Sequence, residues 1–205
     1  MPYYPNLRKE KKLLRQGYQH ISGLDEAGRG SWAGPIVAGA VILDPNIKIK
    51  GIDDSKKLRA PLRKRIFLEI TATAKAWATG IVSAQNVDKL GIAQANIVAM
   101  QLALDNLKIK ADYFLADGLK FEFGSLPGQT IIKGDHKVSS IAAASIVAKV
   151  VRDALMDDFD DQYPQYGFNH HKGYGTNHHF QMLMEHGISK IHRKSFRPMK
   201  NLVKE

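Results

Sequence analysis

The feature that most constrains the fold is the segment at residues 35–43, which reads PIVAGAVIL and is followed by turn-forming residues at 44–46. β-branched side chains favour extended backbone. Apolar residues at consecutive positions, such as Ile36 and Val37, suit a strand that is buried on both faces. Such a strand needs covering elements on each side, so we predict a sheet with helices packed on it.

The rest of the chain alternates between patterns typical of strands and of helices. Proline is favoured in a first helical turn, so one helix is expected to start at Pro61. The expected strands cover residues 18–24, 35–43, 80–84, 113–116 and 130–133. The expected helices cover residues 7–16, 61–78, 91–107, 139–157 and 176–186. This alternation in 205 residues predicts one α/β or mixed α+β domain of ordinary size.

Composition excludes several classes of protein and site. The chain has no cysteine, so disulfides, zinc–thiolate sites and thiol nucleophiles are excluded. Its N-terminal residues are charged and lack the apolar core of a signal peptide. No stretch approaches the roughly 18 apolar residues that a membrane span needs. We therefore expect a cytoplasmic protein with no membrane partner.

The chain is strongly basic. Lysine and arginine total 30 against 20 acidic residues, which gives a net charge of +10. Such an excess favours a polyanionic partner such as a nucleic acid. A basic protein with no nucleic-acid role would have the same composition, so charge alone leaves both interpretations open.

Four acidic residues fall where an expected strand ends or a new element begins: Asp25, Glu26, Asp117 and Asp135. Carboxylates on neighbouring strand ends repel one another, so they favour a hard cation between them, Mg²⁺ or Mn²⁺. Two such ions can activate water and stabilise a leaving oxygen in phosphodiester cleavage. The alternative is that Asp117 and Asp135 are ordinary turn residues, because aspartate beside glycine is common in turns.

The residues just after the acidic pair form a glycine–arginine loop, Gly28-Arg29-Gly30. Glycines on both sides of an arginine let the backbone approach a ligand closely. Free N–H groups can then meet phosphate or sugar oxygens, and Arg29 can clamp a phosphate. The alternative is a tight turn with an exposed arginine, because two glycines alone are weak evidence for a ligand.

Residues 166–176 are dense in glycine, aromatic and basic side chains, including His171, Lys172 and Tyr174. Aromatic rings can stack on a sugar or base while lysines meet phosphates. Six of the eight histidines lie between residues 170 and 192, which makes a zinc site a rival interpretation. We disfavour zinc because the histidines are interleaved with lysines and glycines and no His-Glu-x-x-His pattern occurs. A solvated surface loop is the third interpretation.

Taken together, these motifs resemble ribonuclease HII, the bacterial type 2 ribonuclease H family. The matching stretches are residues 23–30, 33–35, 54–58, 117–118, 133–135, 141–150, 152–153, 171–176 and 192–196. The resemblance spans roughly residues 20–198, and the ordered set is far more specific than any single motif.

The resemblance implies a ribonuclease H-like fold, with a mixed central β-sheet flanked by helices and a small helical C-terminal part. We accordingly divide the chain into a basic helical extension at residues 1–17, a catalytic core at 18–158 and a substrate-binding segment at 159–205. An endonuclease with two Mn²⁺ or Mg²⁺ ions is implied. Its catalytic and metal-binding residues would be Asp25, Glu26, Asp117 and Asp135.

The resemblance also implies how substrate is read. In the family, the loop of Gly28, Arg29 and Gly30 reads the ribonucleotide 2′-hydroxyl, the group that distinguishes RNA from DNA. The residue that matches Tyr174 packs against the deoxyribose at an RNA–DNA junction. Family members cut RNA–DNA hybrids and also cut on the 5′ side of single ribonucleotides in duplex DNA, leaving 3′-hydroxyl and 5′-phosphate ends.

Two features favour type 2 over type 3. Type 3 relatives usually carry an extra N-terminal substrate-binding domain and lack the loop arginine, whereas about 17 residues precede the first expected strand here and Arg29 is present. Archaeal members often end in a sliding-clamp-binding peptide, and residues 198–205 have no such aromatic motif.

We expect a monomer. Further contacts to the nucleic-acid backbone are expected from Lys56, Lys57, His171 and Lys172.

Two rival functions stay open. A non-catalytic hybrid-binding protein would use the basic surface alone, and the four acids argue against it because without metal ions they would only repel phosphate. Another nuclease or a transposase-like enzyme could share the fold. Arg29 between its two glycines and the motif around Tyr174 disfavour that second rival.

Overall fold

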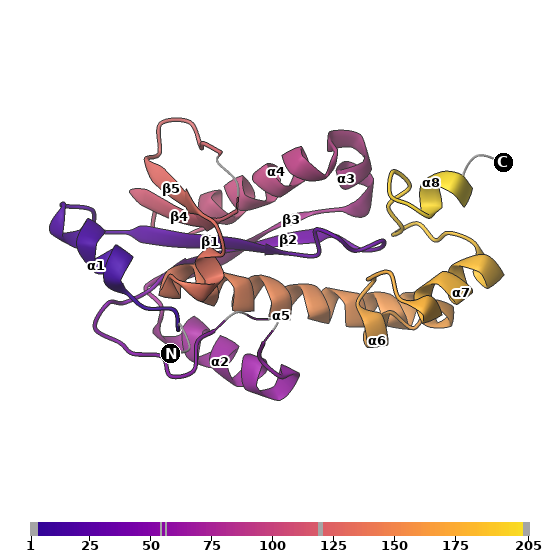
Figure 1. The fold of residues 1–205 in the computed structure, drawn as a ribbon, viewed down its shortest axis with the longest axis horizontal. Helices are drawn as coiled ribbons and strands as arrows, with labels where there is room; N and C mark the ends of the chain where they lie inside the picture. The colour runs from indigo at the N-terminus through magenta and orange to yellow at the C-terminus, as the bar shows by residue number, and fades with distance from the viewer. Residues whose placement is uncertain (1–3, 54, 56, 119–120, 203–205) are drawn as a thin grey trace.

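The computed structural model describes residues 4–53, 55, 57–118 and 121–202. A five-stranded sheet with the order β3-β2-β1-β4-β5 forms its centre (Figure 1). The strands are β1 (Ile21–Ala27), β2 (Ile36–Ile42), β3 (Ala76–Val82), β4 (Tyr113–Asp117) and β5 (Gly128–Ile131). β1 pairs antiparallel with β2 and parallel with β4, so the sheet is mixed. The predicted class, a mixed central sheet flanked by helices, is confirmed.

Helices cover both faces of the sheet. α5 (Ser139–Gln162) and α2 (Ala60–Thr73) lie on one face, while α3 (Ala84–Leu90) and α4 (Ile92–Asp105) lie on the other (Figure 1). All seven residues of β2 are buried, as its continuous apolar pattern predicted. Ile36 and Ile42 join the core beneath α4, and Val41 points to the core that α2 and α5 close.

α5 packs directly on the backbones of β1 and β2. A Cβ added at Gly23 would lie 2.1 Å from the carbonyl carbon of Ser140, and one added at Gly39 would lie 2.4 Å from the carbonyl oxygen of Ala144. Only glycine leaves room for this approach. The close packing fixes the height of α5 over the two strands, and therefore the position of every side chain that α5 carries toward the end of β1.

The remaining helices lie at the two ends of the molecule. They are α1 (Arg8–Arg15), the 3-10 helices η1 (Gly134–His136) and η2 (Pro164–Tyr166), α6 (Phe168–His171), α7 (Asn177–His186) and α8 (Met199–Leu202). α1 is fastened to the start of α5, because Glu10 Oε1 accepts the Ser140 N–H at 2.9 Å.

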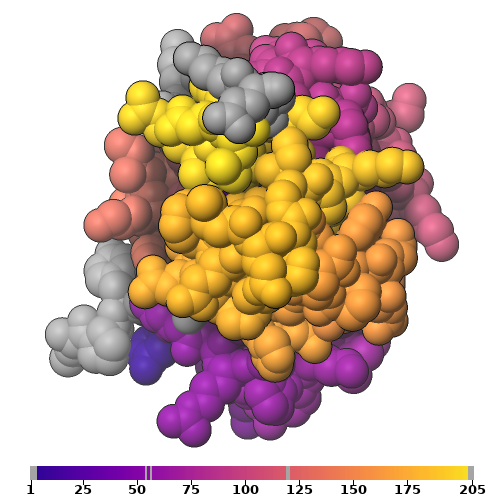
Figure 2. Space-filling view, turned by 90° about the vertical axis from the view of Figure 1, so that its right-hand side faces the viewer, coloured from indigo at the N-terminus to yellow at the C-terminus, as the bar shows by residue number. Residues whose placement is uncertain are grey.

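The C-terminal helices pack around the far end of α5 and form a third apolar cluster with Ala33, a residue of the loop after β1 (Figure 1). Figure 2 looks at this end, where the orange and yellow atoms of the C-terminal part cover much of the surface. The three-part division of the chain stays a prediction. Within the described residues, no helix is long and apolar enough to cross a membrane.

One predicted element is wrong in its limits. The helix expected over residues 61–78 ends at Thr73, and the strand expected at 80–84 is β3, which starts at Ala76. From Ala76 on, buried residues alternate with more exposed ones such as Trp77, which is the period of a strand. β3 pairs with β2 along its whole length, so tertiary pairing overrides local helix propensity.

Further boundaries differ from the prediction. The strand expected at 18–24 is β1, which runs from Ile21 to Ala27, so Asp25 and Glu26 lie within it. The strand expected at 130–133 is β5, which runs from Gly128 to Ile131.

α3 was not expected, and it begins because the Ser83 hydroxyl accepts the Asn86 N–H, which caps the first turn. α5 continues to Gln162, beyond the expected end at residue 157. Phe159, which lies in the extra length, packs against the C-terminal cluster.

Candidate active site

The acidic residues are brought together by the ends of the central strands. In the parallel pairing of β1 with β4, Leu24 lies opposite Ala116, and Asp25 and Asp117 are the next residues on the two strands. Asp117 Oδ1 accepts the Gly134 N–H at 2.6 Å, which ties β4 to η1, the helix that carries Asp135. Three segments far apart in the sequence therefore place their carboxylates at one edge of the structure.

Asp25 is the centre of this acidic cluster. Burial is the largest cause that raises its pKa well above the ordinary value, and the negative charges of Glu26, Asp117 and Asp135 raise it further. The carboxylate accepts the N–H of Glu26 at 2.7 Å, which opposes the shift. Ionisation of Asp25 therefore costs free energy in the folded protein, because the carboxylate is buried and three other acids lie near it.

The cluster fits hard divalent cations by the chemistry of its donors. All four side chains offer oxygen only, which is the donor that Mg²⁺ and Mn²⁺ prefer. Repulsion among the four carboxylates contributes to the raised pKa of Asp25. A bound cation would offset this repulsion. In the conformation observed, no three His, Asp or Glu side chains of the described ranges converge closely enough to ligate one ion.

We predict that Asp25→Asn stabilises the metal-free protein by about 1–2 kcal/mol. An acid whose pKa is higher in the folded than in the unfolded state costs stability once the pH exceeds the unfolded value. Asparagine keeps the acceptor for the Glu26 N–H and removes the charge. Urea unfolding at neutral pH in a chelator measures the change. The exposed Asp158→Asn is the matched control, and an equal shift in both variants would contradict the prediction.

A cleft opens beside the acids. It has a volume of about 170 Å³ and brings the glycine–arginine loop opposite Tyr174. Arg29 Nη1 lies 3.7 Å from Glu26 Oε1, so the loop and the acidic cluster are in contact. The lining residues are Glu26, Ala27, Gly28, Arg29, Gly30, Ser55, Lys149 and Tyr174.

Three lining residues, Ala27, Ser55 and Lys149, were not among the predicted site residues, and the last two have polar side chains. Lys149 Nζ pairs with Asp153 Oδ1 at 2.5 Å and lies 5.6 Å from the centre of the Tyr174 ring. All three residues belong to stretches that carried the family resemblance, so their place in those motifs was the signal available in the sequence. Lys149 adds a cation to the wall that faces the acids.

The loop conformation is held by the guanidinium of Arg152, a side chain of α5 with no exposed surface. It donates hydrogen bonds to the carbonyl oxygens of Pro35, Ala33 and Lys172 and to the Ser31 hydroxyl. Burial lowers the pKa of Arg152, and these acceptors compensate its charge. One side chain thus connects the loop after β1 with the segment that carries Tyr174.

The fit around this guanidinium explains one glycine of the loop. Gly28 has a φ of 88°, and a Cβ there would lie 1.9 Å from Nε of Arg152. Any side chain at this position would both strain the backbone and displace the guanidinium. The Arg152 carbon Cζ also lies 5.2 Å from the centre of the Tyr174 ring, on which it stacks as a cation.

A second buried arginine, Arg193, supports the same loop from the C-terminal segment. Its Nε donates to the Gly34 carbonyl at 3.1 Å and its Nη1 to the Arg29 carbonyl at 3.0 Å. Burial, followed by the charge of Arg152, lowers the pKa of Arg193 to about 9. Sequence reasoning singled out neither arginine as a site residue, because an arginine in a sequence carries no sign of whether it will be buried.

The predicted lysines differ in their surroundings. Lys57 is exposed and pairs with Asp53 at 3.4 Å. Lys172 forms an ion pair with Asp157. Lys56 lies outside the described residues.

His171 is buried, and both of its ring nitrogens have backbone partners. Nε2 lies 2.9 Å from the Tyr166 carbonyl oxygen, and Nδ1 accepts the Gly173 N–H at 3.2 Å. In this conformation His171 contacts the protein backbone, so its predicted contact with nucleic acid stays a prediction.

We predict that the histidines behind Tyr174 make the protein sensitive to mild acid. Burial is the main cause that lowers the pKa of His179 to about 4 and that of His192 to about 3. In the unfolded chain they regain a pKa of about 6.5. Their contribution to the free energy of unfolding is therefore complete above pH 6.5 and is lost as the pH falls toward the folded pKa values. We expect the free energy of unfolding to fall by about 3 kcal/mol between pH 7 and pH 5.

Urea unfolding at the two pH values measures this loss. The His192→Asn variant should show a smaller difference between pH 7 and pH 5 than the native protein. The variant His170→Gln is the control, because His170 is exposed and lies outside the buried pair. An unchanged pH dependence in His192→Asn would rule out this explanation.

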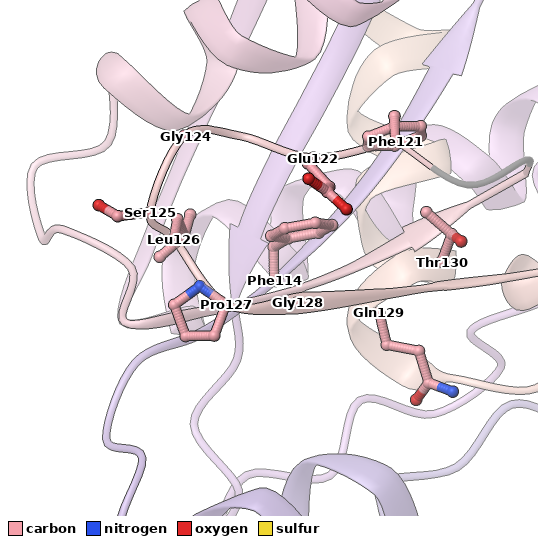
Figure 3. Close-up of a pocket in the computed structure, with 10 residues that line it drawn as sticks. All are labelled: Phe114, Phe121, Glu122, Gly124, Ser125, Leu126, Pro127, Gly128, Gln129 and Thr130. Atoms are coloured by element: carbon pink, nitrogen blue, oxygen red, sulfur yellow. The ribbon is translucent and has the colours of Figure 1, made fainter.

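A larger hollow, of about 450 Å³, lies beside β4 and β5, where the turn at residues 121–127 folds over Phe114 (Figure 3). Phe121 and Phe123 pack on the Phe114 ring, with centroid distances of 6.0 and 5.0 Å. Among the described residues that line it, only Glu122 is charged. The functional site is therefore assigned to the acidic edge and its smaller cleft.

Comparisons with known proteins show the family to which the chain belongs. The family model of ribonuclease HII matches residues 22–199. Ribonuclease HII of Vibrio cholerae is 50% identical over 196 residues, which cover 96% of this chain and 95% of that protein.

Two solved structures share the fold at lower sequence identity. Ribonuclease H2 from Pyrococcus horikoshii matches with a TM-score of 0.74 at 24% identity, over 90% of this chain and 97% of that one. Bst-RNase HIII in complex with Mn²⁺ matches with a TM-score of 0.64 at 18% identity, over 89% and 68%.

The mixed sheet, the family model and the relative therefore define a ribonuclease H, a hydrolase that cuts within a nucleic-acid strand. Within this class the chain belongs to the ribonuclease HII family, because both the family model and the relative span nearly all of it.

Proposed function

We propose that the protein hydrolyses the RNA strand of RNA–DNA hybrids and cuts on the 5′ side of single ribonucleotides in duplex DNA, leaving 3′-hydroxyl and 5′-phosphate ends. The observation that carries this proposal is a cluster of four carboxylates beside a cleft lined by residues 28–30 and Tyr174. Glu26 belongs to both, so an acidic centre and a surface suited to a sugar–phosphate backbone are in direct contact.

The proposed metal-binding residues are the four acids, and two divalent ions would bind there. A structural relative binds Mn²⁺, and the oxygen-only donors lead us to extend Mn²⁺ or Mg²⁺ to this chain. When bound, such ions would supply an activated water and stabilise the leaving oxygen. The proposed holders are Asp25, Glu26, Asp117 and Asp135.

The glycine–arginine loop is the proposed reader of the ribose. Backbone N–H and carbonyl groups at residues 28–30 can meet a 2′-hydroxyl, which both donates and accepts hydrogen bonds. Arg152 and Arg193 hold this loop by bonds to the carbonyls of Ala33, Gly34 and Arg29, so little order has to be gained when substrate binds.

The opposite wall of the cleft is the proposed contact for the strand that follows the ribonucleotide. Tyr174 would pack its ring against the deoxyribose at the junction, and Lys149, which also lines the cleft, would offer charge to the phosphates. Lys57 and Lys172 would add phosphate contacts outside this lining. We further propose that the protein acts as a monomer, with residues 159–205 as its substrate-binding segment.

A duplex that holds one ribonucleotide tests the central proposal. With Mg²⁺ or Mn²⁺ we expect one cut on the 5′ side of the ribonucleotide, and in a chelator none. Asp25→Asn should lower turnover by about a thousandfold, because charge at the reaction centre is lost while the fold is kept. Gel-resolved cleavage measures the turnover, and circular dichroism checks that the fold is kept. Near-normal cleavage by Asp25→Asn would refute the metal assignment, and binding without any cleavage by the native protein would refute the enzymatic proposal.

Tyr174→Ala tests the role of the aromatic wall. We expect the ratio of kcat/KM on an isolated ribonucleotide to kcat/KM on a continuous hybrid to fall about tenfold, because loss of the ring removes packing at the junction. Tyr174→Phe keeps the ring and should keep most of the ratio. If Tyr174→Ala and the native protein share one ratio, Tyr174 does not recognise the junction.

A further inference from the structure

Three buried histidines lie behind Tyr174, on the side away from the cleft. His171, His179 and His192 come from α6, α7 and the segment after α7, and they are 9%, 0% and 2% exposed. The rings of His171 and His179 stack with centroids 4.3 Å apart, and Nε2 of His179 lies 3.0 Å from Nε2 of His192. His179 and His192 have almost no exposed surface, so their effect on a substrate in the cleft must pass through the residues they contact.

The partners of the pair fix which nitrogen carries each proton. His192 Nδ1 accepts the Ser189 backbone N–H at 2.9 Å and lies 2.8 Å from the Ser189 hydroxyl. The hydroxyl can donate or accept, but the N–H can only donate, so Nδ1 offers a lone pair and the proton is on Nε2. His179 Nδ1 lies 3.0 Å from the Tyr174 carbonyl oxygen, an acceptor, so here the proton is on Nδ1. The His192 Nε2–H then donates to the lone pair of His179 Nε2.

The result is a chain of donors with one direction. It runs from the Ser189 N–H through His192 and His179 to the carbonyl of Tyr174. Every link is satisfied when both rings are neutral, and a second proton on His179 would set two N–H groups against each other. Burial lowers the pKa of both rings, in agreement with this neutral arrangement.

His171 anchors the residue that precedes Tyr174. Its Nε2–H faces the Tyr166 carbonyl, which leaves Nδ1 to accept the Gly173 N–H. Gly173 in turn accepts the N–H groups of Trp32 and Ala33 through its carbonyl, at 2.8 and 3.2 Å. The backbone on both sides of the Tyr174 N–H is therefore held, on one side by His171 and on the other by His179.

The same bonds argue against a zinc site at this cluster. A histidine ligand needs a free lone pair on the nitrogen that meets the metal. To provide one at Nε2, His192 would have to move its proton to Nδ1, where the Ser189 N–H already points. Across the described residues, no group of three His, Asp or Glu side chains is placed to hold a metal.

We propose that His179 and His192 are positioning residues for substrate selectivity: the donor chain from Ser189 sets the Tyr174 carbonyl and thereby the place of the Tyr174 ring in the cleft. This inference rests on the proposed role of Tyr174 at the RNA–DNA junction. The decisive contact is the hydrogen bond from His179 Nδ1 to the Tyr174 carbonyl, because it joins the buried pair to the cleft-lining residue.

Two substitutions of His179 distinguish the effect of its hydrogen bond to the Tyr174 carbonyl from the effect of its ring filling space in the core. In His179→Asn the side-chain amide can place an N–H near the position of Nδ1 and donate to the Tyr174 carbonyl. In His179→Gln the longer amide reaches the position of Nε2 and meets His192 but leaves the carbonyl without its donor. Both variants lose the ring, so a role in stability alone would affect them alike.

The readout is the ratio of kcat/KM on an isolated ribonucleotide to kcat/KM on a continuous hybrid. We expect His179→Gln to lower it about tenfold, the effect expected of misplacing an aromatic packing surface, and His179→Asn to keep it within about twofold. Equal ratios for the two variants would overturn the proposal.

A double-mutant cycle with Tyr174→Ala tests whether the effect passes through Tyr174. In that background His179→Gln should cause no further change in the ratio, and a persistent change would overturn the proposal. If Tyr174→Ala alone leaves the ratio of the native protein unchanged, the proposed function of Tyr174 has failed, and the donor chain is then judged by spectroscopy.

Nitrogen-15 spectra of the histidine rings at pH 7 give that independent measurement on the native protein. The donor chain requires the Nδ1–H tautomer for His179 and the Nε2–H tautomer for His192. The opposite tautomer at either ring, or a protonated ring, would overturn the donor chain whatever the activity data show.

Discussion

The close packing of α5 on the backbones of β1 and β2 is the constraint on which the rest of the structure depends. It is possible because Gly23 and Gly39 present no side chain to the helix. At this height Arg152 of α5 reaches the carbonyls of the loop after β1, and Lys149 reaches the cleft. A bulkier residue on either strand would lift the helix and move the acids and the binding loops apart.

Where the charged side chains are buried matters in this protein as much as how many there are. The net charge of +10 suits a polyanion, yet the edge of the candidate site is acidic and Asp25 is buried among other carboxylates. Two cations, Arg152 and Arg193, are buried and donate hydrogen bonds to backbone carbonyls. They hold the loop after β1 in place. The acidic edge then keeps an excess of negative charge, which favours divalent ions.

Much of the site was within reach of the sequence, and the physical reasons for what was not are specific. Asp25, Asp117 and Asp135 could be proposed because strand ends meet at an edge and each acid stands beside glycine or another acid. Arg152, Arg193, His179 and His192 were not proposed as site residues. Their roles depend on hydrogen bonds to carbonyls more than a hundred residues away, or on ring-to-ring contacts, and neither leaves a local pattern.

The sequence by itself determined the class of fold, the continuous burial of β2 and the family, because apolar periodicity and ordered motifs are properties of the chain. Only the tertiary structure decided where β3 begins, which arginines are buried, and that His171 faces backbone groups. These outcomes depend on partners supplied by distant segments. A hydrogen-bond donor shows its function only when the acceptor that the fold brings to it is known.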